Sequence, residues 1–461
     1  MSALDFSEFN GFDDKLWKQH IQMDLNGKDY NQALIWESPD GIAVQPFYTK
    51  NNTKVSSIPD LPDTWDHTTQ IYMGDKNVVE QLIEQKLRQG IRSFHLVCDQ
   101  PFEPAEVLNN FANYSGIQLI LDCNFLNKTW LIELIEKAKG AKVALYLNQD
   151  PLHHLAKTGN WPAHPDNVFK PLYTILTQNS DETSCLGVHA ILYAESGASN
   201  VQQLAYSMAQ ANETLEQLSG HGSLPKSLSL NFSFGLGPNY FFEIAKLRAV
   251  RRLCPLLGRI HDVEIKCHIT ALPAQRFMTL YDFNNNLLRH SSAMMAGILG
   301  GANALCNLPY DHHYKKSHEF SQSLAENQLF ILESEAFQDI DARVTNGAYF
   351  IEQLTEKLAE QALTLFKSIE ASGGWLKAIK KGTLQRKIKE QHEKSVRGLD
   401  SLDAVVIGVN KYADSTQKMQ DQIELYPFQK MNPQKTLVAP IVARRLTQKF
   451  ELQRLNDEKQ A

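Results

Sequence analysis

The strongest constraint on the fold is a regular alternation of two kinds of segment along the middle of the chain. Short runs rich in β-branched and aromatic residues alternate with longer segments whose apolar residues recur at helical spacing, as Val79, Ile83 and Leu87 do. The predicted strands span residues 69–73, 93–98, 118–122, 143–148, 188–193, 227–232, 263–268 and 302–308. Alternating strands and helices build a parallel sheet, and about eight such units close into a barrel. The sequence therefore predicts an α/β fold, a (β/α)8 TIM barrel.

The chain extends beyond this barrel on both sides. The predicted parts are an N-terminal arm (1–62), the barrel with its C-terminal helices (63–396) and a linker-like helical tail (397–461). The arm contains segments around Trp17 and Trp36 but shows no sustained period. A stretch rich in Pro, His and Asn at residues 151–167 predicts an excursion from the barrel mouth. The helical region after the eighth strand is broken near residues 339–348 and at Gly373-Gly374.

Composition excludes several classes of protein. The chain has 461 residues, 43% hydrophobic and 21% charged, with a formal net charge of −6, as in ordinary globular proteins. We expect no nucleic-acid partner, because no basic tract is long enough. We expect no membrane span and no signal peptide, because no apolar run approaches about 20 residues and the N-terminus is acidic and polar. These features predict a cytoplasmic protein, and the six scattered cysteines predict reduced, mostly buried thiols.

Polar residues follow several predicted strands, at the end of a TIM barrel where catalytic residues lie. They are Asp99, Asp122, Asn148, Glu195, Asn231, His268 and Asp311. A carboxylate-rich mouth could hold a divalent cation. Asp and Asn after a strand more commonly cap the next helix by accepting hydrogen bonds from its free N–H groups. We therefore favour capping and expect no tightly bound metal.

Histidine clusters offer a second metal hypothesis. His312, His313 and His318 lie near Asp311, but their spacing does not match H-E-x-x-H, so we expect a loop-exposed cluster. Three more histidines lie in the excursion at 151–167 and lack any partner spacing for a metal; they are His153, His154 and His164.

A basic helix and a glycine pair could suggest cofactor binding. Lys246, Arg248, Arg251 and Arg252 share one predicted helix, and they indicate either an anion or CoA-phosphate site or a solvated, partner-facing basic side. We favour the basic side. Gly300-Gly301 follows a helix and precedes a strand, the reverse of the order in a dinucleotide-binding fingerprint, so a tight turn explains it.

Several segments together resemble the methylmalonyl-CoA mutase family. They occur in the family's order: PDGIAVQPFYT at 39–49, NYFFEIAKLRA at 239–249, NNLLR at 285–289 with GGA at 300–302, GAYFIEQLT at 347–355 and GVNKY at 408–412. The resemblance covers most of the chain, from about Trp36 to the tail. It implies an acyl-CoA mutase barrel, in agreement with the strands predicted from periodicity.

The sequence departs from the catalytic members at positions that carry their chemistry. Those members have a Tyr-His pair just before a Glu-Ala-Gly-Ala run; here the run is ESGA at 195–198, and Ile191 and Leu192 stand at the pair. Neither side chain can donate a hydrogen bond. A family His that precedes Gln-Thr-Ser-Gly corresponds at best to His268, which is followed by ITALP. The substrate-contacting Arg and Tyr segment is not recognisable in residues 65–72, and the cobalt-ligating motif Asp-x-His-x-x-Gly is absent from the sequence.

These departures make the chain similar to the noncatalytic small subunit of heterodimeric family members, in a short form without the cobalamin domain. The resemblance implies a large-subunit partner that carries adenosylcobalamin, no cofactor on this chain, and an arm that lies across the partner; folding of the arm onto its own barrel is the alternative. Two other functions stay open. One is a catalytic barrel that uses a separate cobalamin-binding chain, and the other is an unrelated metal-dependent hydrolase built on Asp311 and its neighbouring histidines.

Overall fold

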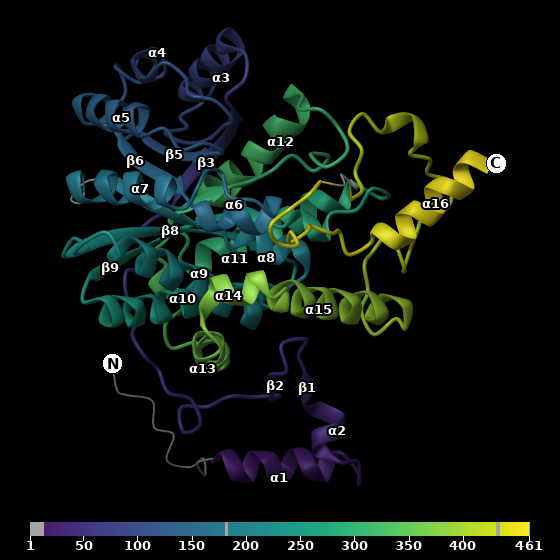
Figure 1. Cartoon of the computed structure of the whole chain (residues 1–461). Helices are drawn as coiled ribbons and strands as arrows, with labels where there is room; N and C mark the ends of the chain where they lie inside the picture. The colour runs from purple at the N-terminus through teal and green to yellow at the C-terminus, as the bar shows by residue number, and fades with distance from the viewer. Residues whose placement is uncertain (1–12, 180–182, 430–433, 461) are drawn as a thin grey trace, which may run out of the picture.

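Eight parallel strands close into a barrel at the centre of the molecule (Figure 1). The computed structural model describes residues 13–179, 183–429 and 434–460. The barrel strands are β3 (Asp66–Tyr72), β4 (Ser93–Cys98), β5 (Gln118–Cys123), β6 (Ala144–Gln149), β7 (Thr183–Val188), β8 (Ser227–Leu236), β9 (Glu264–Pro273) and β10 (Ala304–Cys306). Their closed order is β10-β3-β4-β5-β6-β7-β8-β9, and each neighbouring pair is parallel. The predicted TIM barrel is confirmed.

Helices cover the outer surface of the barrel. They are α3 (Lys76–Arg88), α4 (Pro104–Asn109), α5 (Lys128–Gly140), α7 (Asp166–Gln178), α9 (Asn200–Ser219), α10 (Tyr240–His261), α11 (Asn285–Gly300) and α12 (Glu319–Phe330). Two short helices, α6 (Pro151–Thr158) and α8 (Ile191–Ser196), follow the carboxyl ends of β6 and β7. Alternate strand residues point outward and join the apolar stripes of these helices in one core, as Leu119 and Leu121 of β5 do with Leu131 and Leu134 of α5. The remaining strand positions point into the barrel, so the interior is available for polar side chains.

One predicted strand is wrong. Seven of the predicted strands overlap observed ones closely, but the run at 188–193 lies mostly beyond β7, which ends at Val188, and Ile191–Ser196 is the helix α8. The segment that does form β7, TSCLGV, contains two hydroxyl residues and a glycine, and it gives a weak strand pattern. The run after it is more apolar and was therefore predicted as the strand, because a short apolar run does not by itself distinguish strand from helix.

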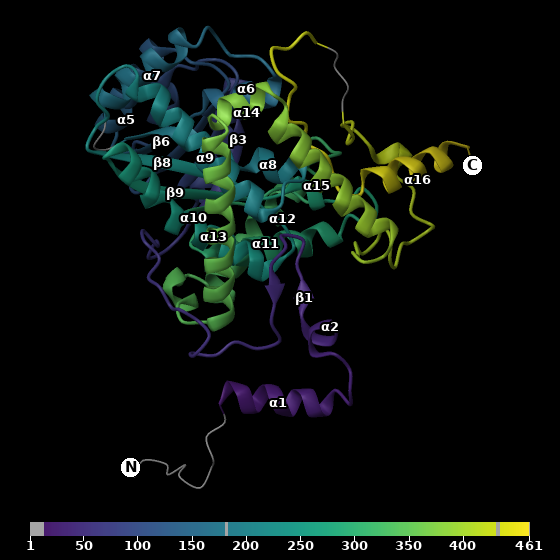
Figure 2. The ribbon, with the colours of Figure 1, turned by 60° about the horizontal axis from the view of Figure 1, so that its bottom comes forward.

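The arm divides into a docked part and a projecting part. Its elements are α1 (Asp14–Asp24), α2 (Tyr30–Leu34), β1 (Trp36–Glu37) and β2 (Ala43–Val44), the last two forming an antiparallel hairpin. The Trp36 ring packs against Phe242 at 5.9 Å, and Asp40 Oδ1 accepts a hydrogen bond from the backbone N–H of Val201. In contrast, α1 stands away from the barrel (Figures 1 and 2), and within this fully described helix no residue is buried.

The C-terminal part runs across the carboxyl ends of the barrel strands. After α13 (Tyr349–Ala371), α14 (Gly374–Lys380) and α15 (Thr383–Asp400), the chain returns over the barrel before the last helix, α16 (Gln448–Gln460). We call residues 437–447 the strap. Its backbone N–H groups donate to carbonyl oxygens of Gly159, Ala156, Glu195 and Arg276 in turn. Gly159 has a φ of +80°, and a Cβ there would collide with the Val438 carbonyl oxygen, so glycine permits this close approach.

Two further expectations concern membranes and thiols. Among the described residues, no helix is both long enough and apolar enough to cross a bilayer. All six cysteines are free thiols; Cys123 is partly exposed and the other five are buried, as predicted.

Candidate functional site

A network of hydrogen-bonded polar side chains fills the interior of the barrel. Asp122 of β5 accepts a hydrogen bond from Asn148 Nδ2 at 2.6 Å, and its other oxygen lies 2.8 Å from His95 Nε2. Asn231 Nδ2 donates to Asn148 Oδ1 at 2.5 Å, and Asn231 Oδ1 lies 2.8 Å from His268 Nδ1. Four of the seven residues predicted at the mouth are therefore joined to one another, together with His95.

The network continues to the carboxyl ends of β6 and β7. His189 Nε2 lies 3.2 Å from Asp122 Oδ1, and its Nδ1 lies 3.1 Å from Asp150 Oδ2. Asp150 also accepts from Gln210 Nε2, at 2.9 and 2.7 Å for its two oxygens. Gln210 Oε1 in turn accepts from the Tyr193 hydroxyl at 2.5 Å. The network thus links the barrel interior to the surrounding helices α8 and α9.

Charge is balanced within this network. Burial by itself would lower the pKa of His95, but the negative charge of Asp122 and its hydrogen bond raise that pKa to about 10. His189 behaves in the same way. Burial by itself would lower its pKa, but the charges and hydrogen bonds of Asp122 and Asp150 raise that pKa to about 9. Although burial disfavours an ionised carboxyl, the charges of His95 and His189 hold the pKa of Asp122 well below its ordinary value. At neutral pH the interior therefore contains carboxylates neutralised by imidazolium groups.

Asp150, His153 and His189 bring three possible metal ligands within 4.8 Å of one another. The His153 and His189 rings stack with centroids 4.4 Å apart and 29° between their planes. A ring nitrogen binds a metal in the plane of its ring, so two stacked rings do not both point at one ion. Both nitrogens of His189 already face carboxylates. The arrangement fits a histidine–carboxylate ion pair between His189 and Asp150 better than a metal centre.

Asp99, Glu195 and Asp311 occupy separate places. Asp99 accepts hydrogen bonds from the Tyr72 hydroxyl at 2.5 Å and from Asn124 Nδ2 at 2.6 Å, on the exposed rim. Glu195 lies on α8, and its Oε1 accepts from the backbone N–H of Gln275 at 2.7 Å; burial raises its pKa to about 7.

Asp311, in the loop after β10, is buried beside a histidine. His318 Nε2 lies 2.8 Å from Asp311 Oδ2, and the His312 side chain is exposed. Within the described ranges, Asp150 with its two histidines is the one group whose ligand atoms converge, so the hydrolase centre considered for Asp311, His312, His313 and His318 is not assembled.

The capping interpretation was wrong for the seven mouth residues. The helices that follow them begin at other residues; the N-caps are Glu103 for α4, Asn127 for α5, Asp150 for α6, Ser199 for α9, Asn239 for α10, Asn284 for α11 and His318 for α12. Four of the seven side chains point across the barrel and bond to other strands instead.

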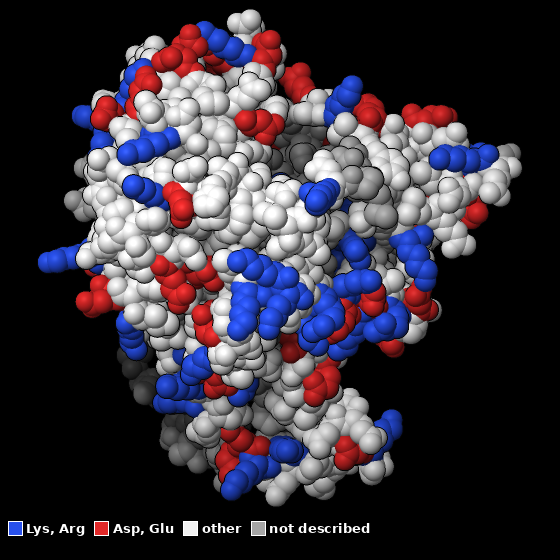
Figure 3. Space-filling view, in the orientation of Figure 1, with Lys and Arg blue, Asp and Glu red and all other residues white. Residues whose placement is uncertain are grey.

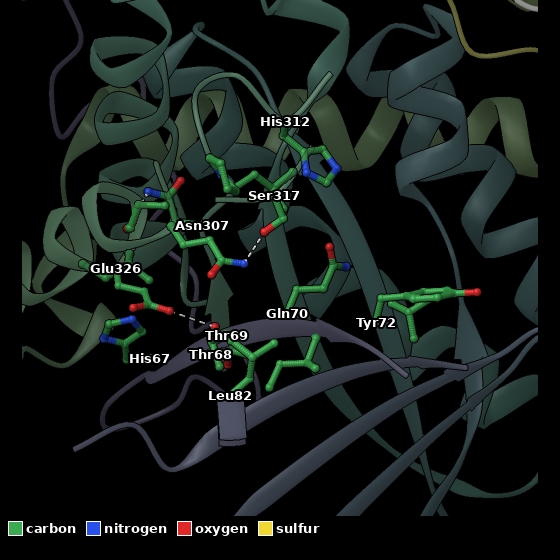
Figure 4. Close-up of a pocket in the computed structure, with 17 residues that line it drawn as sticks. His67, Thr68, Thr69, Gln70, Tyr72, Leu82, Asn307, His312, Ser317 and Glu326 are labelled. Atoms are coloured by element: carbon green, nitrogen blue, oxygen red, sulfur yellow. Dashed lines mark hydrogen bonds between the residues drawn. The ribbon is translucent and has the colours of Figure 1, made fainter. Parts of the chain in front are cut away.

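A pocket of about 420 Å³ lies beside the carboxyl half of β3, next to the point where its pairing with β10 ends at Thr68 and Cys306 (Figure 4). Glu326 of α12 projects into it and accepts from Thr69 Oγ1 at 3.1 Å, and its other oxygen binds Lys86 Nζ at 2.7 Å. Burial and the nearby Lys86 charge lower the pKa of His67, which also lines the pocket, to about 4. Among the described residues that line this pocket, the single carboxylate is thus neutralised inside the protein.

The basic helix predicted to be solvated faces the protein interior. The side chains of Lys246, Arg248 and Arg251 on α10 are 0% exposed. Lys246 Nζ donates to Gln203 Oε1 and to the Gly235 carbonyl oxygen, both at 2.9 Å, and Arg251 donates to several backbone carbonyl oxygens. The prediction of an exposed basic side was wrong for these three residues because α9, α11 and α13 pack around α10 and cover them. Arg252 stays partly exposed and pairs with Glu356.

The Gly300-Gly301 prediction is confirmed. Gly301 ends α11 with a φ of +82°, a left-handed conformation in the turn that leads to β10.

Sequence reasoning missed His95, Asp150 and His189. Asp150 and His189 are the first residues after β6 and β7, the same kind of position as the predicted mouth residues occupy. His189 was overlooked because the fifth strand was predicted at 188–193, so that this residue lay inside the predicted strand and not after it. His95 lies between apolar residues in the middle of the strand SFHLVC, at an inward position of the two-residue period. A titratable residue in the middle of such a buried strand was the signal that could have revealed it.

Comparisons with known proteins point to one family. Residues 133–459 match the family model described as Methylmalonyl-CoA mutase. The chain is 27% identical over 486 residues to a protein named Methylmalonyl-CoA mutase small subunit from Porphyromonas gingivalis, covering 98% of this chain and 78% of that protein. It is 27% identical to the protein of the same name from Streptomyces virginiae, covering 86% of this chain and 68% of that one. A large subunit from Porphyromonas gingivalis is 26% identical over 257 residues, 54% of this chain and 36% of that protein.

Proposed function

Since the chain belongs to the methylmalonyl-CoA mutase family, we propose that it is the noncatalytic small subunit of a heterodimeric, adenosylcobalamin-dependent methylmalonyl-CoA mutase. In this proposal its role is to stabilise the large subunit, which carries adenosylcobalamin and interconverts methylmalonyl-CoA and succinyl-CoA. The small chain binds no cofactor itself, and the complex is cytoplasmic. Two of the relatives that align with most of this chain are named small subunits, and one of these comes from an organism that also has a protein named large subunit.

The observation that carries the proposal is the environment of Ile191 and Leu192. These residues stand where catalytic members of the family carry a Tyr-His pair. Ile191 packs against an apolar cluster of Leu272, Cys306 and Leu308, and Leu192 belongs to the main core. Side chains built into apolar packing cannot polarise a thioester, because they offer it no hydrogen-bond donor. At this position the chain therefore offers a thioester no side-chain donor, which supports a noncatalytic role.

The filled interior of the barrel supports the same conclusion. The Tyr146 ring of β6 and the His268 ring of β9 meet with centroids 4.1 Å apart. Two strands, β7 and β8, separate β6 from β9 in the barrel wall, so this contact spans the interior. His268 is further fixed by Asn231, and Asn231 by Asn148. Side chains from opposite sides of the barrel therefore meet at this level of its interior, which supports the proposal.

The projecting helix α1 is the proposed contact with the large subunit. Leu16, Trp17 and Met23 on α1 are 38%, 49% and 73% exposed. A helix that carries such side chains outside its own domain gains stability when a partner covers them. The rest of the arm, from the Trp36 hairpin onward, already lies on its own barrel.

The test is purification and assay with and without the large subunit. We expect no mutase activity from this chain alone with adenosylcobalamin and methylmalonyl-CoA, and activity from the copurified pair. Turnover by the isolated chain would overturn the proposal, and so would a large subunit that is equally stable and active alone.

A deletion of residues 1–28 tests the contact itself, because it removes α1 and leaves the docked part of the arm. We expect loss of copurification with an unchanged circular dichroism spectrum of the barrel. Trp17→Ala should weaken association in the same direction. Phe320→Ala, which removes a 64% exposed ring from α12, is the matched control and should leave association intact. Full copurification of the truncated chain would place the interface elsewhere.

A further inference from the structure

A groove rich in cations lies between α15 and the strap. It consists of two pockets, of about 260 and 410 Å³, that share Arg444 as a lining residue. The first is lined by Ser196, Gln385, Arg386, Ile388, Lys389, Pro440, Ile441, Val442 and Arg444, and the second by His392, Val396, Gln429, Arg444, Arg445, Leu446, Gln448, Lys449 and Leu452. We call the two together the basic groove. Small-molecule sites in proteins have volumes of this order, about 300–1,000 Å³.

The groove has five cationic side chains and, among its described lining residues, no carboxylate. Two of the five are neutralised by partners outside the lining: Arg445 by the buried Glu451, and Lys449 by Asp400 at 2.9 Å. The other three, Arg386, Lys389 and Arg444, stay available to a ligand. Arg386 and Lys389 have only long, exposed contacts with carboxylates of their own helix, at 3.9 and 3.8 Å, and such pairs bind weakly.

A buried arginine adds positive charge beneath the groove. Arg276 is 3% exposed, and its Nη1 donates to the Arg444 carbonyl oxygen at 2.9 Å and faces His392 Nδ1 at 2.7 Å. Burial and the charges of Arg276 and Arg444 lower the pKa of His392 to about 4, so this histidine is neutral. The carboxyl group that interacts with Arg276 is Glu195, whose pKa burial raises to about 7. Several cations thus converge with little negative charge to balance them.

The surrounding surface is rich in cations. Lys and Arg side chains gather over α14 and α15, with some Asp and Glu side chains among them over α15 (Figure 3). Lys377, Lys380 and Lys381 at the junction of these helices are exposed. A positive surface around a cationic groove raises the local concentration of an anionic ligand and speeds its entry.

We propose that the basic groove binds a phosphorylated small molecule, with a phosphoryl group held by Arg386, Lys389 and Arg444. A phosphoryl group offers several charged acceptor oxygens to the planar donors of arginine and the ammonium group of lysine. Apolar side chains in the second pocket, Val396, Leu446 and Leu452, give the organic part of the ligand a surface to pack on. The ligand would join α15 to the strap and so stabilise the strap over the barrel mouth.

The experiment is isothermal titration of the full chain with inorganic phosphate and with ADP, at constant ionic strength in chloride. We expect saturable binding with one site per chain, and a loss of affinity of about tenfold or more in Arg444→Gln and in Lys389→Gln, because each removes a charge-assisted hydrogen bond. Binding of both probes indicates a site for free phosphate, and binding of ADP alone indicates a site that also needs the organic part.

Lys394→Gln is the matched control. Lys394 is an exposed lysine of the same helix that lines neither pocket, so this variant should bind like the parent chain. An equal loss in Lys394→Gln would show that general surface charge binds the anion and would overturn the proposal. Absence of saturable binding of either probe would also overturn it. The melting temperature of each unliganded variant checks that the fold is intact. This test needs no large subunit, so its outcome is independent of the proposed function.

Discussion

Two helices of this protein carry similar numbers of cations and use them in opposite ways. In α10, Lys246, Arg248 and Arg251 are fully buried, and each donates hydrogen bonds to groups of the same chain. In α15, Arg386 and Lys389 are exposed and line the basic groove. The two helices look alike as lists of residues, and the difference lies in their neighbours.

The neighbours of α10 supply what its cations need. α9, α11, α13 and β9 pack around it, and they contribute carboxylate, amide and backbone oxygens at hydrogen-bond distance. A buried charge is tolerated only with such partners, because leaving water is costly. The cations of α15 keep their hydration and stay available to a ligand. We therefore expect substitutions in the buried set to change stability, and those in the exposed set to change binding.

The largest effect should follow from Arg248→Met. Arg248 Nη2 donates to Glu352 Oε1 at 2.7 Å, and both side chains are 0% exposed, so the substitution leaves a buried carboxylate without its partner. We expect a loss of about 3–5 kcal/mol in the free energy of unfolding, measured by urea denaturation. The double variant Arg248→Met with Glu352→Leu removes both charges and should recover much of the loss. A double variant no more stable than the single one would show that packing, and not the unpaired charge, is responsible.

Asp122→Asn should have the next largest effect. We expect a loss of about 3 kcal/mol in the free energy of unfolding at pH 7, because His95 and His189 lose the negative charge that they share. The folded pKa values of these histidines, about 10 and about 9, lie above the ordinary value of 6.5. Their contribution to stability is therefore complete below pH 6.5 and is lost as the pH rises to 9–10. The difference between parent and variant should shrink over this interval, as followed by urea midpoints. A difference that does not depend on pH would contradict the charged network.

Glu195→Gln tests a buried carboxyl group that lies next to Arg276, beneath the exposed basic groove. The folded pKa of Glu195, about 7, is above its ordinary value of 4.5, so the folded state holds a proton that the unfolded state has released. The parent chain should lose stability between pH 4.5 and 7, and the glutamine variant should not lose this part. We expect the variant to gain about 3 kcal/mol in the free energy of unfolding relative to the parent over that interval. Parallel curves of melting temperature against pH would show that Glu195 titrates normally.

The smallest effect on stability should come from the exposed set. Arg386→Gln and Lys389→Gln should each change the free energy of unfolding by about 0.5 kcal/mol or less, since exposed ion pairs contribute little. A loss of several kcal/mol from either substitution would mean that α15 resembles α10 after all. Thermal melts of both variants beside Arg248→Met make the comparison direct.

Individual elements and residues show which features of the fold and of the site could be predicted from the sequence. The outward positions of β5 and the stripe of α5 were readable because burial of apolar residues imposes a period of two on strands and 3.6 on helices. The strand β7 was misplaced because its own residues are less apolar than those of α8 beside it. Asp122, Asn148, Asn231 and His268 could be named as mouth residues, but their role as helix caps was wrong, because the sequence does not show what stands opposite each strand.

The barrel, the family and the apolar pair Ile191 and Leu192 follow from the sequence alone, because these depend on local pattern and residue identity. Which polar groups meet depends on how the chain folds. Asp150 and Gln210 lie 60 positions apart in sequence and Arg248 and Glu352 lie 104 apart, yet each pair is in direct contact. Packing also encloses Lys246, Arg248 and Arg251 of α10, while Arg386 and Lys389 of α15 line an open groove. The physical reason is that the free energy of a charge depends on the groups and the water around it, and closure of the barrel sets those surroundings.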